Sequence, residues 1–201
     1  MNRAIRVGAA ILVLAGIPTA SFAEQRVRTA EGREVILRDD GTWIYADELK
    51  KAPKAVLQFQ DKRGNYALYL PPNKWKKTEG LNESADVQFR HVDGDAFAMV
   101  IAERFMLPLD TLKEAAISNI QDIDPAATVV KEERRKVNGR EVLCMTINAK
   151  PKGIPATYYG YYYTGEEGSI QVITFTAQNL FKEIKPELDA FLNGFTLLKK
   201  P

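Results

Sequence analysis

Few side chains in this chain of 201 residues could carry out nucleophilic or metal-centred chemistry. Cys144 is the only cysteine and His91 the only histidine, so a zinc site with two imidazoles is excluded. A lone cysteine also excludes an intrachain disulfide. Cys144 lies in the apolar run 142–147, where a thiol usually packs as a small hydrophobic group. We therefore expect it to be buried and unreactive.

His91 closes the strand-like run 87–90, next to the turn Asp93-Gly94-Asp95. It could be a base oriented by Asp93 or Asp95, but no nucleophile lies nearby, so we favour a half-exposed residue at a strand end. Ser84, Ser118 and Ser169 lack the sequence contexts of serine hydrolases. Glycine-rich phosphate loops are also missing. The sequence therefore predicts no catalytic residue, no metal site and no cofactor, and a protein that is not an enzyme.

The tyrosine-rich run 158–163 is the feature most open to a functional interpretation. In a strand, Tyr159, Tyr161 and Tyr163 share one face, with Tyr158 and Tyr162 on the other face beside Gly160. One face must meet the core, and the other could present phenols to a partner. The alternative, which we favour, is that both faces are covered, one by a helix and one by the N-terminal hairpin with Trp43. Tyr159, Tyr161, Tyr163 and Trp43 are the candidate binding residues.

The first 23 residues read as an export signal. Arg3 and Arg6 precede an apolar run over 7–17, and Ser21-Phe22-Ala23 is a small-x-small cleavage site before Glu24. The run is too short to span a bilayer, which takes about 20 residues. We expect cleavage after Ala23, a periplasmic or secreted protein, and no stable membrane insertion afterwards.

Charge narrows the range of partners. The chain has 28 basic and 26 acidic residues, and because the first 23 residues hold two arginines and no acid, the remainder is balanced. This balance argues against nucleic acid as a partner, since phosphate binding needs a positive surplus. We expect the partner to be another envelope protein.

The remaining elements indicate an α+β fold. Strand-like runs pair around turn residues, at 87–92 with 96–105, at 129–137 with 140–149 across Asn138-Gly139, and at 157–163 with 169–176. Helical stripes follow: Leu112, Ala116, Ile120 and Ile123 within 108–124, and a second stripe within 180–192. Hairpins followed by helices favour an antiparallel sheet with two main helices packed on it.

Details at the ends of these helices are also predicted. Asp110 or Thr111 can cap the first helix, and Pro186 suits the first turn of the second, which ends at Asn193-Gly194. A short edge strand is expected over 195–198.

Ahead of this body, the run 27–38 and Thr42-Trp43-Ile44-Tyr45 flank Asp39-Asp40-Gly41, which predicts a β-hairpin. The predicted organisation is a signal peptide at 1–23, a hairpin segment at 24–48, a linker at 49–55 and an α+β domain at 56–201.

Residues 65–199 resemble the PsbP/DcrB-like family. The resemblance lies in Tyr69-Leu70-Pro71 followed by Trp75, in the tight turn within 137–141, in the tyrosine strand running into 170–173, and in the closing stretch 185–195. Residues 24–48 look like a separate Asp-Gly-Thr-Trp hairpin found ahead of various exported domains. The resemblance implies a central antiparallel sheet used for binding or assembly, and it transfers no functional residue.

Our expectation is therefore an exported, non-enzymatic binding or assembly module. A hydrolase built from carboxylates alone, which needs two carboxyl groups about 5 to 10 Å apart across a cleft, is the alternative. A carrier of a small apolar ligand is a further alternative, and it would need a cavity between sheet and helices.

Overall fold

The computed structural model describes residues 25–37, 43–46 and 55–198. The predicted signal peptide, the turn at 39–41 and most of the predicted linker lie outside these ranges. The chain divides into two compact units, residues 1–52 and 53–201, and each is considered by itself. In the described ranges, no helix has the length and apolar character needed to cross a membrane.

The first unit holds a three-stranded antiparallel sheet, β1 (Gln25–Arg28), β2 (Glu34–Leu37) and β3 (Trp43–Tyr45), in that order. The predicted pairing across 39–41 is present, because Ile36 lies opposite Ile44. The run 27–38 is not one strand, however, since it turns at Gly32, whose φ is 79°. The segment is therefore a three-stranded meander rather than the predicted hairpin.

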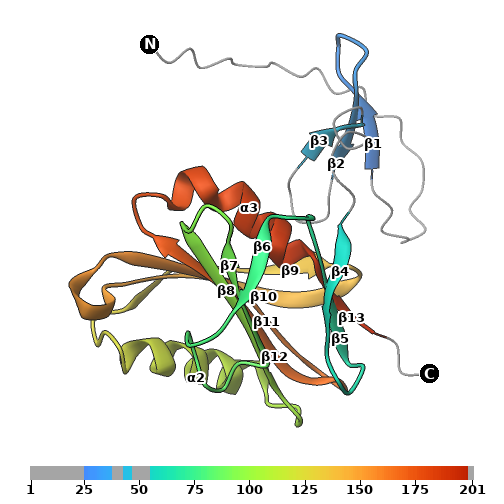
Figure 1. Ribbon diagram of the computed structural model, residues 1–201. Coiled ribbons are helices and arrows are strands. Elements are labelled where there is room, and N and C mark those ends of the chain that lie inside the picture. Colours follow the sequence, from blue (N-terminus) through green and yellow to red (C-terminus); the bar gives the residue numbers. More distant parts are fainter. Residues whose placement is uncertain (1–24, 38–42, 47–54, 199–201) are drawn as a thin grey trace. The chain divides into compact units, whose positions relative to one another are not determined.

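The second unit is built on a seven-stranded antiparallel sheet of order β6-β7-β8-β12-β11-β10-β9 (Figure 1). Its strands are β6 (Trp75–Thr78), β7 (Val87–His91), β8 (Ala96–Glu103), β9 (Thr128–Val137), β10 (Arg140–Ala149), β11 (Ala156–Gly165) and β12 (Gly168–Ala177). All three predicted hairpins are present. The predicted α+β class with an antiparallel sheet is confirmed.

The turn between β9 and β10 fixes the register in which these two strands pair. Asn138 has φ 48° and Gly139 has φ 80°, so both central residues are left-handed, as a type I′ turn requires. Asn138 also donates side-chain hydrogen bonds to the carbonyls of Asn193 and Phe195, at 3.0 and 2.7 Å. The residue that makes the turn therefore also ties it to the C-terminal segment.

Two helices cover opposite faces of this sheet (Figure 1). Helix α2 (Leu109–Gln121) buries Leu112, Ala116 and Ile120 against one face. The predicted fourth member of this stripe, Ile123, lies beyond the helix end and is exposed. Neither Asp110 nor Thr111 caps α2, because Pro108 is the N-cap residue and no side chain bonds there.

Helix α3 (Phe181–Asn193) buries Leu188, Phe191 and Leu192 against the other face. Pro186 lies inside α3 rather than in its first turn, because the helix begins five residues earlier. Gly194 ends the helix as predicted.

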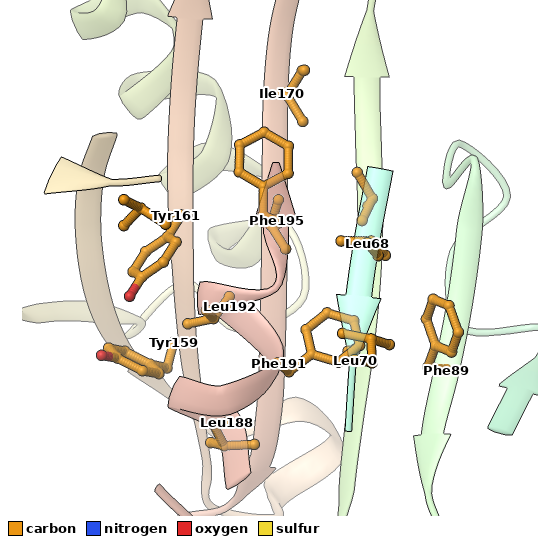
Figure 2. Packing of buried hydrophobic residues seen from close by; sticks show 14 of the residues in the cluster. Leu68, Leu70, Phe89, Tyr159, Tyr161, Ile170, Leu188, Phe191, Leu192 and Phe195 are labelled. Carbon is orange, nitrogen blue, oxygen red and sulfur yellow. The ribbon is translucent and has the colours of Figure 1, made fainter. Parts of the chain in front are cut away.

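A second sheet of order β13-β5-β4 completes the unit, with β4 (Val56–Gln60), β5 (Tyr66–Leu70) and β13 (Phe195–Leu197). Figure 2 shows Leu68 and Leu70 of β5 beside Phe191 of α3 and Phe89 of β7. The small sheet and the large one therefore share one hydrophobic core. A short 3-10 turn, η1 (Pro151–Gly153), joins β10 to β11.

Candidate functional site: a cleft beside Phe105

The predicted tyrosine face lies inside the protein. Tyr159, Tyr161 and Tyr163 of β11 are buried in the core that α3 covers, and Figure 2 shows Tyr159 and Tyr161 beside Leu188 and Leu192. On the opposite face, Tyr158 and Tyr162 belong to the core beneath α2. Both faces of the strand are therefore covered, as we favoured, but the second cover is α2 rather than the hairpin with Trp43.

The buried hydroxyls are already used by the protein. Tyr159 donates to Asp189 at 2.7 Å and accepts from Arg135 at 2.6 Å, and Tyr161 donates to Asn193 at 2.9 Å. Burial raises the pKa of Tyr159 and of Tyr161 far above that of a free phenol. A strand whose phenols are buried and paired holds α3 on the sheet and offers no exposed docking surface.

The remaining predicted residues are placed as follows. Trp43 is exposed on β3, where its ring meets Tyr45 edge-on at 5.3 Å. Burial raises the pKa of the Cys144 thiol, which suits an unreactive position. His91 is 2% exposed rather than half-exposed, because its ring packs against Trp75 at 5.1 Å. Asp93 approaches it at 3.6 Å, but neither ring nitrogen has a hydrogen-bond partner among the described residues.

The surface of the second unit has an open cleft of about 480 Å³. One wall comes from the end of β4 and the turn into β5, and the other from the end of β8 and the loop after it. Aromatic rings and charged groups of both signs line it together: Phe59, Asp61, Lys62, Arg63, Asp86, Ala102, Glu103, Arg104 and Phe105.

A tight turn fixes the first wall. The N–H of Asp61 donates to the carbonyl of Tyr66 at 3.0 Å, and the N–H of Gly64 donates to the carbonyl of Asp61 at 2.9 Å. The carboxylate of Asp61 accepts from Arg63 at 3.3 Å, and Arg63 lies 3.9 Å from Asp86. The hydroxyl of Tyr66 donates to Asp86 at 3.0 Å. Arg63 is therefore held between two carboxylates.

Two hydroxyls fix the second wall. Ser169 of β12 donates to the carbonyl of Phe105 at 2.9 Å and accepts from the N–H of Leu107 at 2.8 Å. Thr164 of β11 donates to the carbonyl of Leu107 at 2.5 Å. The loop is thus tied at its backbone, yet the side chains of Phe105 and Met106 are 58% and 66% exposed. Because the loop backbone is already held, a partner that covers these side chains does not have to order the loop itself.

The charges in the cleft differ in how they are compensated. Arg63 is shared by Asp61 and Asp86, so these three side chains together keep one negative charge. By contrast, Lys62, Glu103 and Arg104 are exposed and form no ion pair with any residue that the structure describes. The cleft therefore presents two cations and one anion that are free to meet a ligand.

Sequence reasoning missed this cleft, because its walls come from segments about 40 residues apart in the chain. One local signal was present. Phe105 and Met106 follow the charged pair Glu103-Arg104 and precede Pro108; the predicted run 96–105 included Phe105, but β8 ends at Glu103, so both are apolar loop residues. The alternation of apolar and polar residues in a strand does not explain apolar side chains in such a loop.

Metal chemistry has no support in the described ranges, where no group of three or more His, Cys, Asp or Glu side chains could hold an ion. The three carboxylates of the cleft therefore do not form a metal site in this geometry. They are the part of the cleft in which acid-base chemistry could be sought.

A scan against protein-family models finds no match, and a search of curated proteins finds no significant relative. Solved structures do match. The cyanobacterial PsbP protein CyanoP of Synechocystis sp. PCC 6803 aligns with a TM-score of 0.53 and 17% identity, over 71% of this chain and 93% of that one. The chain therefore has a PsbP-like fold, as its sequence indicated.

Two weaker matches extend over similar lengths. PA94 of Pseudomonas aeruginosa, a protein of unknown function, has a TM-score of 0.45 and 11% identity, over 73% of this chain and 98% of that one. LpqN of Mycobacterium tuberculosis, described as involved in cell envelope biogenesis, has a TM-score of 0.43 and 9% identity, over 77% of this chain and 96% of that one.

Proposed function

We propose that this protein is an exported, non-enzymatic binding or assembly module, and that its cleft beside Phe105 docks another envelope protein. Export rests on the charged start, the apolar run and the Ser21-Phe22-Ala23 site of the first 23 residues. Binding rests on the geometry of the cleft. The observation that carries the proposal is the anchored loop that leaves Phe105 and Met106 exposed beside unpaired charges.

The composition of this surface favours a protein partner. Aromatic residues, methionine and arginine are enriched in the centres of protein interfaces, and Phe105, Met106 and Arg104 are consecutive here. The charged rim adds specificity and speeds association. The balanced charge of the chain after residue 23 argues against nucleic acid.

The proposal is tested by affinity capture of the tagged protein from its native envelope. The Phe105→Ser, Met106→Ser double variant should lose its specific partner. The matched control is Ile154→Ser, because Ile154 is equally exposed on the η1 loop, far from the cleft in sequence. The proposal is wrong if the double variant, shown to be folded by circular dichroism, captures the same proteins in the same amounts.

One observation supports a second candidate, a hydrolase that uses carboxylates. Asp61, Asp86 and Glu103 line a single cleft. Two of them already have partners, however, because Asp61 and Asp86 are both held by Arg63 and Asp86 also accepts from Tyr66. Turnover of a glycoside by the purified protein, abolished by Glu103→Gln, would favour this candidate over a docking module.

A further inference from the structure

Strand β4 ends at the cleft and has a free edge. It is the outer strand of the β13-β5-β4 sheet, and no strand in the described ranges pairs with its other side. Its outward backbone N–H and C=O groups lie on both sides of the register shift between Leu57 and Phe59, and such groups are a template for a further strand.

The other sheet edges of this unit are protected. Strand β9 carries six consecutive charged residues, 131–136, and β6 carries Lys76 and Lys77. On β13 the carbonyl of Phe195 is already taken, because the amide of Asn138 donates to it at 2.7 Å. The sequence of β4 is Val-Leu-Gln-Phe-Gln, with no charge and no proline. It therefore lacks the side chains that usually discourage strand addition.

The surface around this edge is apolar. Val56 and Leu57 of β4 are exposed, and so is Tyr69, which lies opposite Leu57 on β5. At the other end of β4, Phe59 lines the cleft that also holds Phe105. The edge therefore leads from an exposed apolar patch into the proposed docking site.

The cleft lining and Lys77 together hold four cations, Lys62, Arg63, Lys77 and Arg104, against three anions, Asp61, Asp86 and Glu103, a net charge of +1. The ammonium of Lys77 lies 5.6 Å from the ring of Phe59, and Lys62 and Arg104 lie in the cleft. None of these three cations forms an ion pair within the described part of the chain, and Glu103 is the unpaired anion nearby. A partner with acidic side chains complements this end of the strand.

We infer that β4 binds an extended segment of a partner protein as a fourth strand of the β13-β5-β4 sheet, with acidic residues of that segment over the cleft. This inference rests on the proposed function and specifies the chemistry of its partner. Main-chain hydrogen bonds would supply affinity, and the cations would fix the direction and the choice of segment.

The test uses two labelled peptides of alternating valine and threonine, one ending in a Glu-Glu pair and one ending in Lys-Lys. The acidic peptide should bind the purified protein more tightly, and it should slow amide hydrogen exchange in residues 56–60. Leu57→Lys should weaken its binding by about tenfold by placing a charge on the edge. The matched control is Val130→Lys on β9, because Val130 is 54% exposed and Leu57 is 51% exposed.

The possible outcomes separate this inference from the proposed function. If envelope capture depends on Phe105 but neither peptide protects 56–60, the docking module stands and strand addition is wrong. Equal binding of both peptides would contradict the choice of an acidic segment. Protection of 56–60 without peptide, with a dimer forming as concentration rises, would identify a second copy as the occupant and overturn the inference.

Discussion

The tyrosine strand β11 and the cleft beside Phe105 both gather aromatic and cationic side chains, yet they serve different ends. On β11 the rings are buried, and Arg135 pairs with Glu133 and donates to Tyr159. In the cleft Phe105 is exposed and Arg104 has no ion pair among the described residues. Aromatic content alone therefore does not make a surface available to a partner, and our proposal rests instead on exposed side chains and unpaired charges.

The physical reason lies in the backbone. A central strand such as β11 has a neighbour on each side and a helix over each face, so its side chains must satisfy one another. The loop after β8 has its backbone tied by Ser169 and Thr164 and packs Leu107 on the core, while the side chains of Phe105 and Met106 stay exposed. Residues with no role in the stability of the fold are the ones available for a partner.

The largest expected effect sharpens this contrast. Tyr159→Ala should lower the free energy of unfolding by about 3–5 kcal/mol, because it empties a core position under α3. Phe105→Ala should change it by less than about 0.5 kcal/mol, because that ring is mostly exposed. Urea unfolding followed by circular dichroism measures both. A large loss for Phe105→Ala would mean that the cleft belongs to the core of the fold.

Much of this fold was readable from sequence. The Asn138-Gly139 turn, the paired runs around it and the stripe of Leu112, Ala116 and Ile120 are local patterns, and each is where we expected it. Strand β4 was missed as an element, although Val56, Phe59 and the glutamines around Phe59 could have suggested one. Its pairing with β5 adds a second sheet, and no local pattern states how many sheets a set of strands forms.

The candidate site could not be predicted in the same way. Phe59 and Phe105 meet at one cleft only because the small sheet packs beside the end of β8, which is a tertiary arrangement. Burial of His91 was also unreadable, since it depends on the ring of Trp75 covering it from β6. The residue types are known from the sequence, but tertiary packing determines which of these side chains are exposed.

A middle-sized effect is expected from the two arginines. Arg135→Met should destabilise the fold by roughly 1–3 kcal/mol, because Glu133 then keeps only Lys131 as a partner and the phenol oxygen of Tyr159 keeps only Lys185 as a donor, at the longer distance of 3.4 Å. Arg104→Met should leave stability within about 0.5 kcal/mol of the parent, since its side chain is exposed. Thermal unfolding of the two variants side by side makes the comparison.

Affinity for the acidic peptide should change in the opposite order in the same two variants. Arg104→Met should lower the affinity for the acidic peptide by a few-fold and reduce the salt dependence of that affinity, because one exposed cation is lost. Arg135→Met should leave that affinity unchanged while the protein stays folded. If only Arg135→Met lowered the affinity for the acidic peptide, the network under α3 would have to contribute to recognition.

The smallest expected effect concerns Tyr163, which joins the buried strand to a turn residue by donating to Glu167 at 2.6 Å. Burial raises the pKa of Tyr163 to about 12 from an ordinary value of 10, and the hydrogen bond to Glu167 acts in the same direction. The folded state therefore favours the neutral phenol. Its contribution to stability is complete below pH 10 and is lost as the pH rises from 10 to about 12, because the unfolded chain ionises first.

Tyr163→Phe removes this ionisation and keeps the ring. The variant should lose less stability than the parent between pH 9 and pH 11, values that fall on either side of the ordinary phenol pKa. Urea unfolding at these two pH values, with parent and variant measured together, isolates the difference from the other tyrosines. An equal loss in both proteins would mean that the phenol of Tyr163 meets solvent freely, and the end of β11 nearest the cleft would then behave like the exposed loop rather than like the buried strand.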